Sequence, residues 1–152
     1  MELCGANART SSVIIQRHHQ LKVGMNFDSV IGLDISDQTQ KTVMWQYVET
    51  HQPLAIDMSF SCTGLEDFST SHTKINPGGF HRSREVSIPM TAIVRRLAWR
   101  QPTQSRQLHS ENPRGSEFYQ IGDWNYIANH NRTAWANIDQ YMTNLRNPDD
   151  TI

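Results

Sequence analysis

Long apolar runs, paired cysteines and a leading signal segment are all missing from this 152-residue sequence. No apolar stretch approaches the roughly 20 residues that span a bilayer, and the N-terminus lacks a basic region followed by an apolar one. The only cysteines, Cys4 and Cys62, stand far apart and form neither a zinc-ribbon spacing nor a disulfide framework. We therefore expect a soluble intracellular chain, cytoplasmic or nuclear, with no membrane or metal partner.

An excess of charge of either sign is missing as well. Lys and Arg number 14 and Asp and Glu number 15, so the formal net charge is -1 at pH 7. This balance provides no overall basic field to capture nucleic acid, although local patches stay open. With 37% apolar residues and a mean hydropathy of -0.60, the chain is globular but polar, and its length suits one domain with a modest core.

A short apolar run at residues 53–58 stops abruptly at the small polar residues 59–64, which include Cys62. The run is too short for an independent helix and is typical of a buried strand in a parallel sheet. Ligands and reacting groups of open α/β sheets gather outside the carboxyl ends of such strands. Cys62 is therefore placed where chemistry would be done.

Apolar periodicity alternates between short strand-like runs and helical spacing along most of the chain. Such alternation favours right-handed crossovers and a parallel sheet. We predict an α/β fold, a Rossmann-like three-layer sandwich with a mostly parallel sheet, small or truncated. The expected elements are strands near residues 1–4, 21–28, 53–58 and 107–110, helices over 8–19, 38–51 and 85–100, and a tail with helical spacing at Trp135, Ile138, Tyr141, Met142 and Leu145.

Three features of the first half of the chain can bind a ligand. Gly5 lets the first strand turn into a helix whose free N–H groups can hold a polar or anionic group, although taken alone this glycine is more typical of a simple strand-to-helix connection. Asp28 and Asp34 each follow an apolar run, where a carboxylate can accept hydrogen bonds from ribose hydroxyls. Both are also ordinary turn residues, and Asp37 is predicted to be a helix N-cap.

A polar stretch at residues 65–84 exceeds the usual length of a connection, and we expect a loop that forms a lid, a binding segment or an insertion. Its histidines have no metal-binding spacing. Arg82 and Arg84 could contact phosphate or simply face solvent. Further on, Glu111 and Asn112 end the strand at 107–110, and we expect them beside the carboxyl end of the strand at 53–58.

Five short motifs resemble, in order and spacing, those of S-adenosylmethionine-dependent cytosine-5 methyltransferases. The chain looks most similar to the short methyltransferase-like segments of retroelement-type polyproteins in algae and related protists. The likeness covers residues 1–124, leaving 125–152 as a helical tail, and each motif is only two to four residues long. The motifs are Glu2-Leu3-Cys4-Gly5, Phe27-Asp28, Gly32-Leu33-Asp34-Ile35, Ser61-Cys62-Thr63 and Glu111-Asn112-Pro113.

The resemblance implies a cofactor, S-adenosylmethionine, and a nucleic acid substrate whose target pyrimidine is flipped out of its stack. It makes Cys62 the nucleophile that attacks C6 of the base. Glu111, paired with Asn112, would hydrogen-bond the ring nitrogen and assist its protonation. The cofactor residues would be Cys4, Gly5 and Asn7 in the loop, Asp28 near the ribose and Asp34 near the adenine.

Three interpretations follow from the sequence. The first is a methyltransferase-like domain that binds S-adenosylmethionine and transfers methyl groups. The second is a catalytically inactive retroelement fragment that acts at most as a binding or interaction module, because Phe60 and Ser61 replace the prolines that the family has before its cysteine. The third is a small α/β domain that binds another nucleotide or a phosphate ligand through the Gly5 loop.

Overall fold

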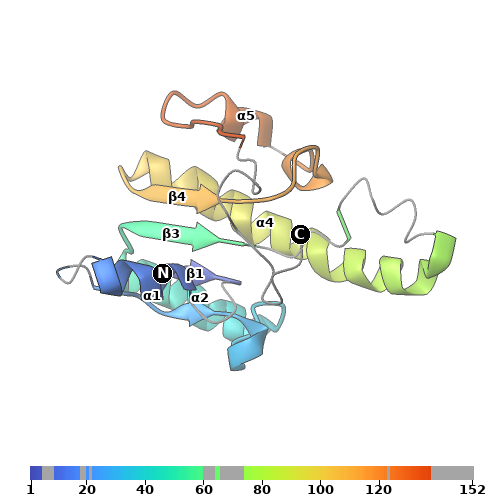
Figure 1. The fold of residues 1–152 in the computed structure, drawn as a ribbon, viewed down its shortest axis with the longest axis horizontal. Coiled ribbons are helices and arrows are strands. Elements are labelled where there is room, and N and C mark those ends of the chain that lie inside the picture. The colour runs from blue at the N-terminus through green and yellow to red at the C-terminus, as the bar shows by residue number, and fades with distance from the viewer. Residues whose placement is uncertain are drawn as a thin grey trace.

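The computed structural model describes residues 1–4, 9–17, 20, 22–59, 64–65, 74–122 and 124–137. In these residues, helices alternate with the four strands of one sheet (Figure 1). The elements are β1 (Glu2–Leu3), α1 (Arg9–Arg17), β2 (Asn26–Phe27), the 3-10 helix η1 (Ser29–Ile31), α2 (Gln38–His51), β3 (Ala55–Met58), α4 (Pro77–Thr103), β4 (Gln107–Ser110), the 3-10 helix η2 (Glu117–Tyr119) and α5 (Trp124–Ala128).

The strand order is β2-β1-β3-β4, and every pairing is parallel. Strand β1 lies between β2 and β3, with Glu2 opposite both Asn26 and Asp57. Because every pairing is parallel, the four carboxyl ends meet at one edge of the sheet. The predicted α/β fold with a Rossmann-like parallel sheet is confirmed.

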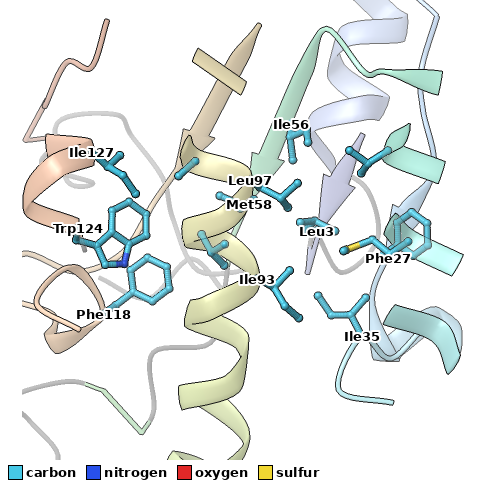
Figure 2. Close-up of a cluster of buried hydrophobic side chains, with 14 of the residues drawn as sticks. Leu3, Phe27, Ile35, Ile56, Met58, Ile93, Leu97, Phe118, Trp124 and Ile127 are labelled. Atoms are coloured by element: carbon cyan, nitrogen blue, oxygen red, sulfur yellow. The ribbon is translucent and has the colours of Figure 1, made fainter. Parts of the chain in front are cut away.

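The two residues of β1 face opposite sides of the sheet, as neighbours in a strand must. Glu2 is buried on the side of α1, where its Oε1 accepts a hydrogen bond from the backbone N–H of Ser11 at 2.5 Å. Leu3 is fully buried on the other side, where Figure 2 shows it pointing toward side chains of β3 and α4. That side holds the core, whose buried apolar residues are Leu3, Phe27, Ile35, Met44, Val48, Ile56, Met58, Leu65, Ile93, Val94, Leu97, Ala98, Phe118, Trp124 and Ile127.

Helix α2 has the bounds that its sequence predicts. Asp37 caps its N-terminus through a hydrogen bond from the backbone N–H of Gln40 to Oδ1 (2.9 Å), which confirms the predicted cap. Gln52 ends the helix in the left-handed conformation (φ 48°), directly before Pro53. The carboxylate of Glu49 pairs with the guanidinium of Arg100 and so ties α2 to α4.

Helix α4 is longer than predicted and corrects two expectations. It begins at Pro77, where the side chain of Asn76 accepts a hydrogen bond from the N–H of Gly79 (2.9 Å), so residues 77–84 are helical and do not belong to a polar loop. An asparagine cap followed by proline starts a helix strongly enough to outweigh two glycines in its first turn. At the other end the helix runs past Pro102 to Thr103.

The last described segment is mostly irregular. Helix α5 packs near α4, and residues 133–137 have no regular structure, with Trp135 exposed and in edge contact with Tyr119. The predicted tail helix falls mainly on residues 138–152, which lie outside the described part of the chain. None of the helices in the described residues combines the length and apolar character that a bilayer crossing needs.

Candidate functional site

A cavity of about 170 Å³ opens at the carboxyl ends of β1 and β2. Three of the residues predicted to bind a cofactor, Cys4, Asp28 and Asp34, line it together. Cys4 and Asp28 meet there because they directly follow the parallel strands β1 and β2, which end at the same edge, and the turn after β2 brings Asp34 to the same space. The remaining lining residues are Phe27, Ser29, Leu33, Ile35, Ser36, Leu65, Val86, Ser87, Met90 and Phe118.

Asp28 is fixed at the cavity rim by the turn that follows β2. Its Oδ1 accepts a hydrogen bond from the N–H of Val30 at 2.8 Å, which caps η1, and its backbone oxygen accepts from Leu33 at 2.9 Å. Gly32 closes this turn with φ 81°, a conformation that suits glycine. The turn role expected for Asp28 is therefore confirmed, and it holds the buried carboxylate against the cavity.

Asp34 follows the same turn, three residues after η1, and its side chain is exposed. Its Oδ1 accepts a hydrogen bond from the backbone N–H of Ser36 at 2.8 Å. A carboxylate has about four acceptor positions, so this one bond leaves Asp34 able to accept others from a ligand. Both acids thus combine a local backbone role with a place at the cavity.

Cys4 follows β1 in a left-handed backbone conformation, φ 54°, which is costly for a residue with a Cβ. Its N–H donates to the backbone oxygen of Phe27 at 2.9 Å, which keeps the strained residue attached to β2. Burial, and after it the charges of Asp28 and Asp34, raise the pKa of the Cys4 thiol to about 12. At neutral pH Cys4 is therefore a neutral lining group and not a nucleophile.

Glu111 and Asn112 follow β4 at the same edge of the sheet, but they line a different and larger hollow. The N–H of Glu111 donates to the backbone oxygen of Met58 at 3.2 Å, so Glu111 lies beside the carboxyl end of β3 as predicted. The side chain of Asn112 donates to the backbone oxygen of Glu111 at 2.7 Å and acts in the turn. Two strand spacings of about 4.8 Å separate β1 from β4, which puts Glu111 roughly 10 Å from Cys4.

Three predicted site residues, Gly5, Asn7 and Cys62, lie outside the described residues. The segment with Cys62 is nevertheless held where it re-enters the described structure. The backbone oxygen of Gly64 accepts from Arg84 at 3.3 Å, and that of Leu65 accepts from the N–H of Glu117 at 2.8 Å. The chain two residues beyond Cys62 is therefore attached to α4 and η2.

An ion pair that the sequence does not predict organises this attachment. Arg84 donates two hydrogen bonds to the carboxylate of Glu117, at 2.5 and 2.7 Å. The hydrogen bonds raise the pKa of Arg84 and lower that of Glu117. Arg84 is thus a structural residue of the site wall. Among the described residues, no three His, Cys, Asp or Glu side chains gather as a metal site would require.

No family model, curated protein or solved structure matches this chain. The structure shows a small α/β domain with a four-stranded parallel sheet.

The close approach at Gly64 predicts a cost for any side chain there. A Cβ on Gly64 would lie 2.8 Å from the backbone nitrogen of Arg84, within a helix that cannot easily give way. We expect Gly64→Ala to lower the free energy of unfolding by about 1 to 3 kcal/mol, measured by urea denaturation. Gly78→Ala is the matched control, because its nearest neighbour is a flexible side-chain atom of Arg82 at 3.5 Å. An equal loss of unfolding free energy in both variants would contradict close packing of Gly64 against α4.

The raised pKa of Cys4 predicts slow thiol chemistry. In a Cys62→Ser background, we expect Ellman's reagent at pH 9 to react with folded Cys4 roughly 100 to 1000 times more slowly than with the urea-unfolded chain, because little thiolate forms. The rate should climb as the pH approaches 12. The stability that the neutral thiol supplies is present below pH 9 and is lost as the pH rises through 12. If the thiol of folded Cys4 reacts within tenfold of the rate in the unfolded chain, its pKa is not raised as described.

Proposed function

We propose that the cavity at the ends of β1 and β2 binds S-adenosylmethionine and that the domain transfers its methyl group to C5 of a pyrimidine in nucleic acid. One observation carries the binding proposal: two carboxylates, those of Asp28 and Asp34, line a cavity in which no described lining residue is cationic. Such a site favours a ligand that brings positive charge and hydroxyl donors. S-adenosylmethionine has a sulfonium, an ammonium and a ribose diol.

The same charge distribution separates this cofactor from phosphate-bearing nucleotides. Phosphate sites in proteins supply arginine, lysine or clustered backbone N–H groups. Here Arg84, the nearest candidate in sequence, is committed to Glu117. A nucleoside triphosphate would place its negative charge toward Asp28 and Asp34, which costs free energy. This argues against a nucleotide or phosphate ligand in the cavity.

The apolar wall suits a flat heteroaromatic ring. Seven apolar side chains surround the two acids, so a purine ring would bury its faces while its polar edge and the ribose meet the carboxylates. At about 170 Å³ the cavity is smaller than the ~300 Å³ typical of whole drug-sized ligands, so part of the cofactor would extend out of it, with the sulfonium at the rim near Asp28 and Asp34. The apolar lining residues are Phe27, Leu33, Ile35, Leu65, Val86, Met90 and Phe118.

Methyl transfer would require the side chains of Cys62 and Glu111, which follow β3 and β4 in the sequence. When bound, S-adenosylmethionine supplies an electrophilic methyl group. The thiolate of Cys62 would add to C6 of the pyrimidine while Glu111 donates a hydrogen bond to the ring nitrogen, which makes C5 nucleophilic. After transfer, loss of the C5 proton expels the thiolate and restores the base. Glu111, roughly 10 Å from the cavity's Cys4 across two strand spacings, is close enough for a base between them.

Binding is tested by isothermal titration with S-adenosylmethionine. We expect measurable heat and a thermal shift, and we expect Asp28→Asn to weaken affinity about 10 to 100-fold, because it removes a charged acceptor while keeping a side chain that can cap η1. Asp37→Asn is the control, since it changes a helix cap outside the cavity in the same way. No heat and no shift at millimolar cofactor would sink the proposal, and a shift with ATP alone would favour a nucleotide site.

Catalysis needs its own measurement, namely transfer of a labelled methyl group from S-adenosylmethionine to cytosine-containing oligonucleotides. We expect Cys62→Ser and Glu111→Ala each to abolish transfer while the cofactor affinity stays within about twofold, because neither side chain is part of the cofactor cavity as proposed. If the wild-type chain binds the cofactor but transfers no methyl group, the binding proposal stands and the proposed enzymatic activity is wrong. Loss of binding in both variants would indicate collapse of the fold instead.

A further inference from the structure

Strand β4 lies at one end of the strand order, so one of its edges has no strand beside it. The backbone N–H groups of Gln107 and Glu111 donate to the β3 segment at 2.8 and 3.2 Å. Successive residues of a strand turn their N–H and C=O groups to opposite edges, so those of Leu108 and Ser110 point away from β3. The oxygen of Ser110 accepts from the hydroxyl of Tyr119 at 3.2 Å. Within the described residues, the N–H and C=O of Leu108 and the N–H of Ser110 have no partner.

The described residues leave this edge without the usual protection. Natural edge strands discourage further pairing with proline, lysine, a bulge or a covering loop. The four residues of β4 include neither proline nor lysine, and their register with β3 is continuous. Helix α5 and residues 132–137 lie on the side of β4 away from β3, and between them and the strand is the larger hollow, of about 1260 Å³ (Figure 1). The edge of β4 therefore opens into this hollow.

The walls of the larger hollow suit a single inserted strand. A strand in a sheet takes roughly 160 Å³ per residue, given spacings of about 4.8 Å between strands, 10 Å between layers and 3.3 Å along the chain, so seven residues take roughly 1100 Å³. The hollow has this volume. Along one wall the ring of Tyr119 contacts those of Trp124 and Trp135, at centroid distances of 5.4 and 4.9 Å. Apolar side chains at alternate positions of an inserted strand would pack on these rings.

Two arginines at the amino end of β4 have only neutral partners. Arg106 directly precedes the strand and donates to two glutamine side chains. Arg132 donates to the backbone oxygen of Pro102 at 2.9 Å and to the hydroxyl of Ser105 at 3.0 Å, which places it at the same end. Both arginines line the larger hollow. Since guanidinium groups form their strongest hydrogen bonds with carboxylates, this end of the hollow favours an acidic group.

The carboxylates that line the hollow lie away from these two arginines. Glu2 is buried and accepts a hydrogen bond from α1, and Asp57 is bonded to His109 at 2.5 Å. Glu111 follows the opposite end of β4, where Arg114 also lines the hollow. The positive charge at the amino end is therefore not balanced by these acids.

We propose that the free edge of β4 binds an extended peptide of another protein as a fifth strand. Its backbone would pair with Leu108 and Ser110, its apolar side chains would alternate along the aromatic wall, and an acidic side chain would contact Arg106 and Arg132. Residues 132–137 wall the hollow on its far side, which leaves room for one strand and obstructs the sheet of a second copy. The proposal involves neither the cofactor nor its cavity, so its failure would leave the proposed function untouched.

The first test uses a blocked synthetic peptide with a glutamate at each end and five alternating valine and threonine residues between them. Saturating peptide should slow amide hydrogen exchange at Leu108 and Ser110 at least tenfold, followed by NMR of the full chain. The amide of His109 is the internal control, because it points to β3 and should exchange slowly with or without peptide. Unchanged exchange at Leu108 and Ser110 in millimolar peptide would overturn the proposal. Protection in the protein alone that grows with its concentration would assign the edge to a dimer and reject the peptide.

Methylated peptides separate backbone pairing from apolar attraction. N-methyl groups on the valines and N-methyl groups on the threonines block the N–H groups of opposite strand edges. We expect one of these two peptides to bind at least tenfold more weakly than the unmethylated peptide, and the other to bind nearly as well, measured by fluorescence anisotropy. Equal affinities of the two methylated peptides would reject strand addition at one edge.

The charge argument has a matched peptide as well. Glutamine in place of both glutamates keeps the size of the peptide and removes its charge, so we expect about three- to tenfold weaker binding at low salt. An unchanged affinity would contradict the contact with Arg106 and Arg132.

Discussion

Backbone pairing of the two-residue strand β1 determines where everything else in this domain lies. Its neighbours attach to it on both sides: Cys4 donates to Phe27 of β2 at 2.9 Å, and Asp57 of β3 donates to Met1 at 3.0 Å. A slip of one residue would turn Leu3 toward α1 and force Glu2 into the apolar core. The register therefore decides which face is the core, and it also sets Cys4 at the rim of the cavity.

The charge of that cavity restricts its ligands more than its shape does. Asp28 and Asp34 each accept a hydrogen bond from a backbone N–H of their own turns, and both line the cavity. A site built in this way disfavours anions and gains free energy from a positive ligand. The neutral thiol of Cys4 adds no charge to this balance.

The sequence predicts those parts of the fold whose signals are local. Helix α2 has its cap at Asp37 and its stop at Pro53, and the strand at 55–58 lies in a short apolar run with clear ends. The strand at 107–110 has a weaker signal, because Leu108 is its one apolar residue. The gathering of Cys4 and Asp28 was predictable because parallel topology brings strand ends together, whereas Asp34 reaches the cavity through the turn that follows β2. The ion pair of Arg84 with Glu117 was not, since 33 residues separate the partners and neither carries a local signal for the other. The first turns of α4 were missed because Gly78 and Gly79 resemble a loop when tertiary contacts are unknown.

Helix α4 keeps the two hollows of the domain apart. Met90 lines the cavity and Ala98 lines the larger hollow, and the eight helical steps from one to the other span about 12 Å. The two hollows have no lining residue in common. Glu111 lines the larger hollow and not the cavity, so a base that reaches Glu111 has to come through the larger hollow.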